Sequence, residues 1–193
     1  IVVQLPEPLD GTKKEDVEAV KYLRLNKKPL LISEITKERI RKADELYSEK
    51  LTNSQNGFKV LKLAETNIRH WESDFDNLEQ SLLNANQSIK PDRSAEDVLY
   101  EILLKYGIEL TVPVEQQTVA GKQVYVVGAG ALLVCLDDNI TTEVVEGIAT
   151  LKHELDPETT QVVFKDAGFA DSVVKTNAIQ ILKQAGIDDV KSI

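Results

Sequence analysis

The acidic pair Asp137 and Asp138, followed by Asn139, is the grouping in this sequence whose residue types could hold a metal ion or act in acid–base chemistry. The pair comes after an apolar, β-rich run and before a segment with helical spacing. Asp and Asn at such a junction also cap the following helix by accepting hydrogen bonds from its first N–H groups. We favour capping and keep a small metal-dependent enzyme as the alternative.

Two other groups of residues have the types, but not the spacing, of a metal site and of a nucleotide-binding loop. His70 and His153 do not have metal-ligand spacing to each other or to Cys135. The Gly-Ala-Gly sequence at 128–130 follows a strand-like run, as the start of a nucleotide-binding loop would. It lacks the third Gly and the helix that such a loop needs, and a β-rich run follows it. We therefore expect a hairpin turn there, and we predict no catalytic and no metal-ligating residue in this chain.

Basic residues gather in the first third of the chain, where they could contact phosphates. Four carboxylates on the same expected helix offset them, so a solvated face is the simpler interpretation. The basic residues concerned are the same in both the phosphate-contact and the solvated-face interpretation: Lys13, Lys14, Lys21, Arg24, Lys27, Lys28, Lys37, Arg39, Arg41 and Lys42.

Length and composition limit the class of protein. With 193 residues, 42% of them hydrophobic and 28% charged, the chain is long enough for one large or two small folded domains. No apolar run is long enough to span a membrane, and one cysteine cannot form an internal disulfide, so we expect a cytoplasmic protein with no membrane partner. The net charge of -9 is divided unevenly, at about +2 over residues 1–68 and about -11 over residues 69–193.

The elements expected in the first third are a strand, a helix and a second strand. Residues 1–5 are rich in β-branched side chains, Ser33 is a suitable N-cap for a helix that runs to Leu51, and residues 58–63 alternate between apolar and basic. Turn formers at 52–57 separate the helix from the second strand. Parallel strands joined by a helix form an incomplete sheet, and the chain contains no Met, so we expect a piece of a longer protein.

The rest of the chain predicts a linker and a second α/β unit. Residues 69–93 are acidic and polar, with Trp71 and a short helix around Leu82. From Ser94 the spacing predicts a capped helix that ends at Gly107, a helix from Thr141 or Thr142 to residue 155, and a helix capped by Asp171 that ends at Gly186. Strands are expected at 109–112, 122–127, 131–136, 161–164 and 190–193.

Several strings, in this order, resemble the C-terminal third of the modification subunit of type III restriction-modification systems. In the first part they are residues 1–7, 34–41 and 57–63, followed by Asn67-Ile68 and Trp71. In the second part they are LYEILLKYGIELT at 99–111, TQVVFKDAGF at 160–169, KTNAIQILKQAG at 175–186 and VKSI at 190–193. The resemblance covers nearly the whole chain.

The resemblance implies an adenine-specific DNA methyltransferase that transfers a methyl group from S-adenosylmethionine to the exocyclic amine of a flipped adenine. In that family the Asp-Pro-Pro-Tyr type catalytic motif and the Phe-x-Gly-x-Gly cofactor loop come earlier in the chain, and neither is present here. The strand after the glycine loop ends in an acidic residue that binds the ribose hydroxyls. The resemblance places Gln4 at that position, with Glu7 as the nearest carboxylate, so Gln4 and Glu7 are the candidate cofactor-binding residues.

The sequence thus predicts an α/β protein. Residues 1–68 are expected to be the trailing strand, helix and strand of a Rossmann-like methyltransferase domain, residues 69–93 a linker, and residues 94–193 a C-terminal α/β domain with a mixed sheet. The full-length protein would bind DNA and S-adenosylmethionine. Because an acidic surface repels phosphates, we expect the second part to serve homodimerisation or docking of the restriction subunit. The alternative is a protein-interaction module unrelated to methylation.

Overall fold

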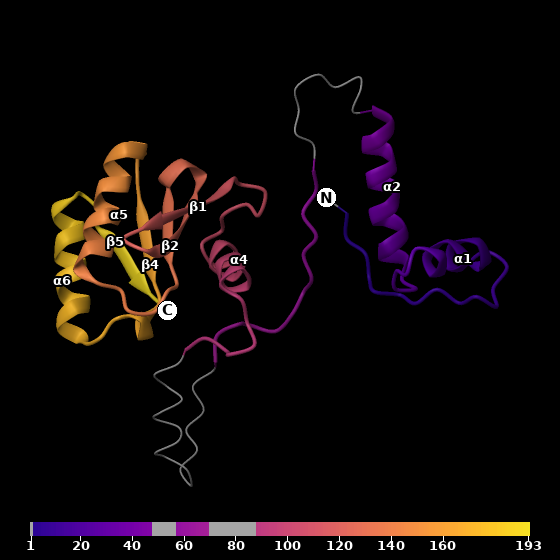
Figure 1. The fold of residues 1–193 in the computed structure, drawn as a ribbon, viewed down its shortest axis with the longest axis horizontal. Helices are drawn as coiled ribbons and strands as arrows, with labels where there is room; N and C mark the ends of the chain where they lie inside the picture. Colours follow the sequence, from indigo (N-terminus) through magenta and orange to yellow (C-terminus); the bar gives the residue numbers. More distant parts are fainter. Residues whose placement is uncertain (1, 48–56, 70–87) are drawn as a thin grey trace, which may run out of the picture. The chain divides into compact units, whose positions relative to one another are not determined.

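The computed structural model describes residues 2–47, 57–69 and 88–193 (Figure 1). The chain divides into two compact units, Ile1–Val60 and Leu61–Ile193, which we call the N-terminal unit and the C-terminal unit. Among the described residues the protein is α/β, with five α-helices and one five-stranded mixed sheet. None of the helices in these residues is both long and apolar enough to cross a membrane.

The C-terminal unit is built on a sheet whose strands follow one another in chain order. The strands are β1 (Val114–Val119), β2 (Lys122–Val127), β3 (Leu132–Cys135), β4 (Gln161–Phe164) and β5 (Asp189–Ser192). The first three pair antiparallel, and β3, β4 and β5 pair parallel. Helices α5 (Thr142–Leu155) and α6 (Ser172–Gln184) supply the crossovers that parallel neighbours require. The mixed sheet expected from the sequence is therefore confirmed.

Both faces of the sheet are buried. Alternate residues of β2 and β3, such as Val126 and Leu133, face α5 and α6. Their neighbours Val127 and Leu132 face α4 (Ala95–Lys105) on the opposite side, and Figure 1 shows the resulting order of helix, sheet and helix. A strand segment that is buried on both faces is apolar throughout rather than alternating, as in residues 124–127 of β2 and in the whole of β3.

The helix ends follow the capping signals in the sequence. Ser94 and Asp97 form a reciprocal capping box at the start of α4, and Asp171 accepts hydrogen bonds of 2.8 Å from the N–H groups of Val173 and Val174 at the start of α6. Helix α5 ends at Asp156, which adopts the left-handed conformation just before a proline. The expected helices at 95–106, 142–155 and 172–185 are confirmed.

The Gly-Ala-Gly segment is the turn of a hairpin. Gly128, Ala129 and Gly130 have φ values of 59°, 55° and 100° and join the antiparallel strands β2 and β3 through a short 3-10 turn. A Cβ on Gly130 would lie 3.1 Å from the Leu155 side chain, so close packing also favours glycine there. The hairpin interpretation is confirmed, because a strand rather than a helix follows the turn.

The strand expected at 109–112 is wrong. These residues form a loop whose apolar side chains Leu110 and Val112 pack against the α4 face of the core. The first strand is β1, which starts after Pro113 and has the polar sequence VEQQTV. Periodicity detected the burial of the loop but missed β1, because an edge strand with polar side chains has no continuous apolar face to detect.

The N-terminal unit contains α1 (Val17–Leu25) and α2 (Ile32–Tyr47). Helix α2 starts at Ile32, so Ser33 lies inside the helix and is not its N-cap. A single antiparallel bridge, Pro8 to Leu31, joins the segment before α1 to the start of α2. The expected turn at 52–56, the end of the expected helix at 48–51, Trp71 and the short helix around Leu82 lie outside the described residues.

The two strands expected in this first third are not formed in the described residues. Residues 2–5 and 58–63 form no ladder, and Val3 and Leu63 are 90% and 103% exposed. β-branched residues stabilise a strand through cross-strand packing, and without a neighbouring strand their propensity is not realised. The Rossmann-like strand, helix and strand are therefore not seen in this structure, although Ile1 lies outside the described residues.

Residues 65–69 belong to the C-terminal unit and are held against α4 by Glu101. Its carboxylate accepts hydrogen bonds from the Thr66 hydroxyl and from the Asn67 N–H at 2.6 Å, and it pairs with Lys105 at 2.9 Å. Ile68 forms a bridge with Ile89, which closes the segment into the same body. Burial raises the pKa of Glu101, but these hydrogen bonds and the lysine outweigh it and lower the pKa from 4.5 to about 2.

This carboxylate makes the C-terminal unit sensitive to acid. A carboxyl whose pKa is lowered by folding stabilises the protein above its unfolded pKa and loses that effect as the pH falls towards the folded value. We expect Glu101→Gln to cost about 1–2 kcal/mol at pH 7, allowing for solvent screening, and the difference from the unmodified protein to shrink between pH 4.5 and about 2. Urea unfolding of both proteins across this pH range measures the difference in their free energies of unfolding. A difference that does not change with pH would contradict the stabilising role of the Glu101 carboxylate.

Candidate functional site

The best-defined polar cluster of the N-terminal unit is centred on Glu38 of α2. The hydroxyl of Tyr22, on α1, donates a 2.9 Å hydrogen bond to Glu38 Oε2. Lys28 and Arg41 both donate to Glu38 Oε1. The Lys42 ammonium lies 5.0 Å from the centroid of the Tyr22 ring, within range of a cation–π interaction. We call these five residues the Glu38 cluster.

The Glu38 carboxylate is held in its charged form. Its side chain is only 14% exposed, and the hydrogen bonds from Lys28, Arg41 and Tyr22, in that order of effect, lower its pKa from 4.5 to about 2. One carboxylate therefore serves two cations, while a third lies over the tyrosine ring. The neighbouring pair on α2, Lys37 and Glu34 at 2.6 Å, is by contrast a simple one-to-one ion pair.

The sequence reveals only part of this cluster. The spacing of Glu38 and Arg41, three residues apart on one helix, is a recognisable local pair. Tyr22 is 16 residues from Glu38 and Lys28 is ten residues from it, and only the packing of α1 beside α2 brings them together. The expected offset of basic residues by carboxylates is seen in the pair of Glu34 with Lys37, whereas Glu38 pairs with both Lys28 and Arg41.

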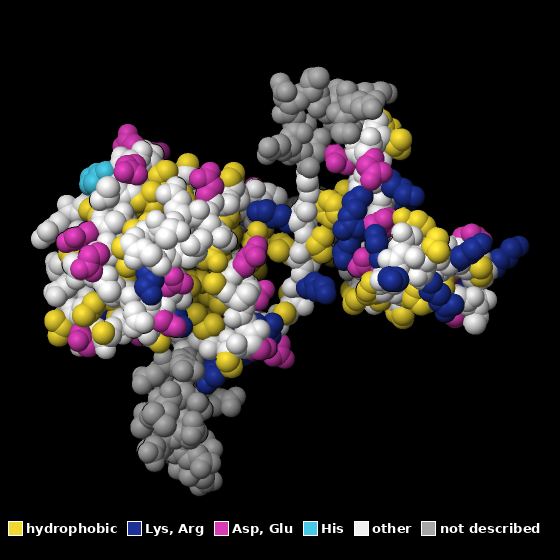
Figure 2. Space-filling model, viewed as in Figure 1, with side chains coloured by type: hydrophobic (Ala, Val, Ile, Leu, Met, Phe, Trp, Pro, Cys, Tyr) yellow, Lys and Arg dark blue, Asp and Glu magenta, His cyan; other side chains and the backbone are white. Residues whose placement is uncertain are grey.

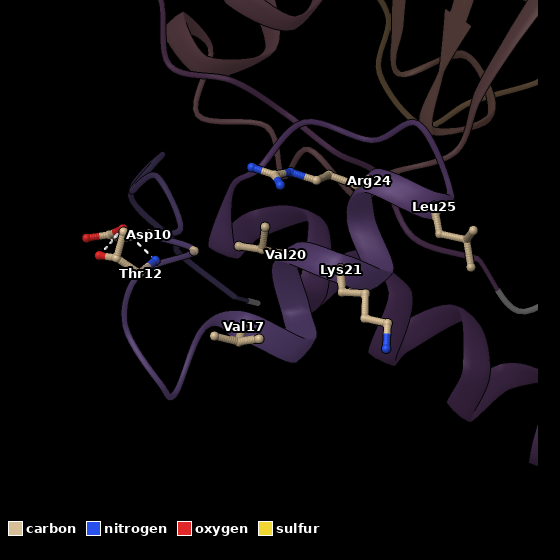
Figure 3. Close-up of a pocket in the computed structure, with 8 residues that line it drawn as sticks. Asp10, Thr12, Val17, Val20, Lys21, Arg24 and Leu25 are labelled. Carbon is tan, nitrogen blue, oxygen red and sulfur yellow. Dashed lines mark hydrogen bonds between the residues drawn. The ribbon is translucent and has the colours of Figure 1, made fainter.

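An open depression of about 820 Å³ lies beside α1 (Figure 3). Its lining combines the apolar side chains of Val17, Val20 and Leu25 with polar ones. Within the lining, Asp10 accepts hydrogen bonds from the N–H and the hydroxyl of Thr12 at 2.9 and 2.8 Å. In Figure 3 the side chains of Lys21 and Arg24 extend from α1 in different directions. They do not converge on one point, as the ligands of a single phosphate would.

Gln4 and Glu7 lie on the extended segment before α1, and both are exposed. The Gln4 amide donates to the carbonyl of its neighbour Leu5 at 3.4 Å, and the Glu7 carbonyl accepts from the Ile32 N–H at 3.1 Å. Neither lines the depression beside α1. Their ribose-binding role stays a prediction from the resemblance.

Asp137 and Asp138 follow β3, at the edge of the sheet where ligands of parallel α/β proteins often bind. Asp137 accepts a 2.8 Å hydrogen bond from the Gln123 N–H of β2, and Asp138 pairs with Lys165 at 2.6 Å. The N-cap of α5 is Thr141, so the capping interpretation of the aspartates is wrong. Each carboxylate instead joins β3 to a neighbouring part of the sheet.

Other candidate ligands are scattered. His153 is exposed on the last turn of α5, and His70 lies outside the described residues. Cys135 is buried within the core, and this burial raises the pKa of its thiol. Across residues 2–47, 57–69 and 88–193, no three His, Cys, Asp or Glu side chains come together in a way that could hold a metal ion.

No protein-family model matches this chain, and no curated protein matches it. The family resemblance of the sequence therefore stays a prediction.

Proposed function

We propose that this chain is the C-terminal region of an adenine-specific DNA methyltransferase of a type III restriction-modification system. The support is the ordered set of similar strings along nearly the whole chain. In this proposal the N-terminal unit is the trailing part of the Rossmann-like catalytic domain. The exposed extended segments at 2–5 and 58–63 would then pair with strands supplied by the rest of that domain, which would also bind S-adenosylmethionine and the target adenine.

We infer that the acidic C-terminal unit serves assembly, through homodimerisation or docking of the restriction subunit. The observation that carries this inference is the outer edge of β1. Among the described residues β2 is the only strand that pairs with β1, so one side of a six-residue strand offers its backbone groups to another chain. Adding a strand at such an edge gives affinity through main-chain hydrogen bonds.

Residue types along β1 agree with a pairing edge. Glu115, Gln116 and Thr118 are exposed, and the strand contains no lysine and no proline, the residues that commonly protect an edge from association. The formal charge of about -11 over residues 69–193 favours a protein partner over a nucleic acid. A protein-interaction module unrelated to methylation would use the same edge but would not recognise the restriction subunit.

The test introduces two lysines on β1, Gln116→Lys with Thr118→Lys. We expect the dimer dissociation constant in sedimentation equilibrium, or the dissociation constant for the restriction subunit in a pull-down titration, to rise at least tenfold, because edge lysines obstruct strand addition. The matched control is Gln180→Lys with Gln184→Lys, which adds the same charge to exposed positions of α6.

Two results would contradict the proposal. One is a chain that is monomeric and fails to bind the restriction subunit. The other is an equal loss of assembly in the β1 variant and the α6 control, which would assign the effect to net charge. Dimerisation without recognition of the restriction subunit would support the homodimer and exclude the docking role.

A further inference from the structure

We propose that the N-terminal unit binds backbone phosphates of double-stranded DNA, through a surface centred on Lys28, Arg41 and Lys42 of the Glu38 cluster. The choice of duplex DNA as the partner rests on the proposed function. The surface itself rests on the contacts and charges described below.

The cations are concentrated in one stretch of sequence. Residues 21–42 contain eight Lys or Arg and only two carboxylates, Glu34 and Glu38. Glu34 is engaged by Lys37, and Glu38 by Lys28 and Arg41. Both available negative charges are therefore used within the stretch, and a formal excess of six positive charges is left over. Figure 2 shows Lys and Arg side chains gathered over α1 and α2.

The packing of α1 against α2 brings several of these cations together on one surface. Tyr22 of α1 and Lys28 of the following loop both contact Glu38, so residues that are 10 to 16 positions apart in the chain lie together. The side chains of Lys28 and Arg41 keep 27% and 49% of their surface exposed, which leaves N–H donors for an added anion. Arg41 also stacks over the Phe58 ring at 5.7 Å, and Lys42 over Tyr22.

These contacts lower the cost of binding. Long basic side chains lose rotamer freedom when they bind an anion, and part of that loss has already occurred where Glu38 and the two rings hold them. Glu45 is near enough to act on Tyr22, and it and its neighbour Asp44 offset part of the positive charge. Lys21, Arg24, Lys27 and Arg39 add to the positive charge of the N-terminal unit.

Such a surface would position DNA without reading its sequence. Contacts to phosphates fix orientation and register, whereas base edges supply specificity. This agrees with the proposed function, in which the region that reads the target precedes this chain. The basic N-terminal unit would then contact DNA while the acidic C-terminal unit contacts protein.

The experiment measures binding of the whole 193-residue chain to a fluorescent 30-base-pair duplex of arbitrary sequence, by anisotropy over a series of salt concentrations. For Arg41→Gln with Lys42→Gln we expect at least a tenfold weaker affinity. The slope of log K against log salt should fall by about 0.9 for each phosphate contact that is lost. The charge-preserving exchange Arg41→Lys with Lys42→Arg should retain most of the affinity and slope.

A matched control removes two cations from the C-terminal unit, Lys122→Gln with Lys183→Gln. The proposal is overturned if this control weakens binding as much as the cluster variant, or if the unmodified chain shows no salt-dependent binding. It is also overturned if the charge-preserving exchange loses binding as fully as the glutamine variant, because the effect would then be structural. Equal or tighter binding to vesicles containing phosphatidylserine would assign the surface to membranes instead.

The DNA-binding role and the assembly role can be tested separately. The β1 lysine variant should bind the duplex like the unmodified chain, and the cluster variant should still dimerise or bind the restriction subunit. Loss of DNA binding alone would leave the assembly role standing.

Discussion

Replacing Phe164 with alanine should lower the free energy of unfolding of the C-terminal unit by about 3–5 kcal/mol. Phe164 ends β4, which lies between β3 and β5, and its side chain is 1% exposed. Its ring packs edge-to-face on Phe169 with centroids 5.2 Å apart, so alanine removes both buried apolar area and an aromatic pair. The close packing of β4 between its neighbours limits how far the site can collapse into the cavity.

Urea unfolding followed by circular dichroism measures this loss. Val173→Ala provides the control, because Val173 is 64% exposed on the first turn of α6 and its truncation should change the free energy of unfolding by less than about 0.5 kcal/mol. A loss below about 1 kcal/mol for Phe164→Ala would show that this ring does not fill the centre of the core.

Replacing Gly147 with alanine in α5 should also destabilise the unit, by about 1–3 kcal/mol, although alanine is the better helix former by up to about 1 kcal/mol. A Cβ at position 147 would lie 2.2 Å from Cγ1 of Val119 on β1, far inside van der Waals contact. The steric term outweighs the propensity term, because either Val119 must change its rotamer or the edge strand must move away from α5.

Substitution of Val119 tests whether its contact with position 147 causes the loss of stability. In a Val119→Ala background the clashing methyl is absent, and Gly147→Ala should then be neutral or stabilising. The coupling between the two substitutions should therefore exceed about 1 kcal/mol in a double-mutant cycle of urea unfolding free energies. Additive effects would contradict it. Because β1 is the proposed pairing edge, Gly147→Ala should also weaken assembly, and Val119→Ala should restore it.

The prediction from sequence succeeded best where local signals and burial agree. Capping residues such as Ser94 and Asp171 determine where helices begin, and the turn at 128–130 requires the positive φ angles that its two glycines accept readily. Continuous apolar runs located β2, β3 and β4, because parallel and central strands are buried on both faces. These features depend on neighbours in the chain or on burial alone.

The prediction failed where a strand depends on its partner. The apolar residues at 2–5 and 58–63 have strand-forming side chains and form no ladder in the described residues, whereas the polar β1 forms one with β2. Pairing supplies most of the stability of a strand, and the sequence of the strand does not show whether a partner is present.

The sequence by itself determined the helices and buried strands of the C-terminal unit and the separation of a basic first third from an acidic remainder, because spacing, capping and charge are local properties. Only the tertiary structure decided that Glu38 joins two cations and Tyr22, that Glu101 holds residues 65–69, and that Asp137 and Asp138 join strands and do not cap a helix. Apart from the local pair of Glu38 with Arg41, each of these contacts links residues ten or more positions apart. The fold alone brings such residues within hydrogen-bonding distance, which no pattern along the chain records.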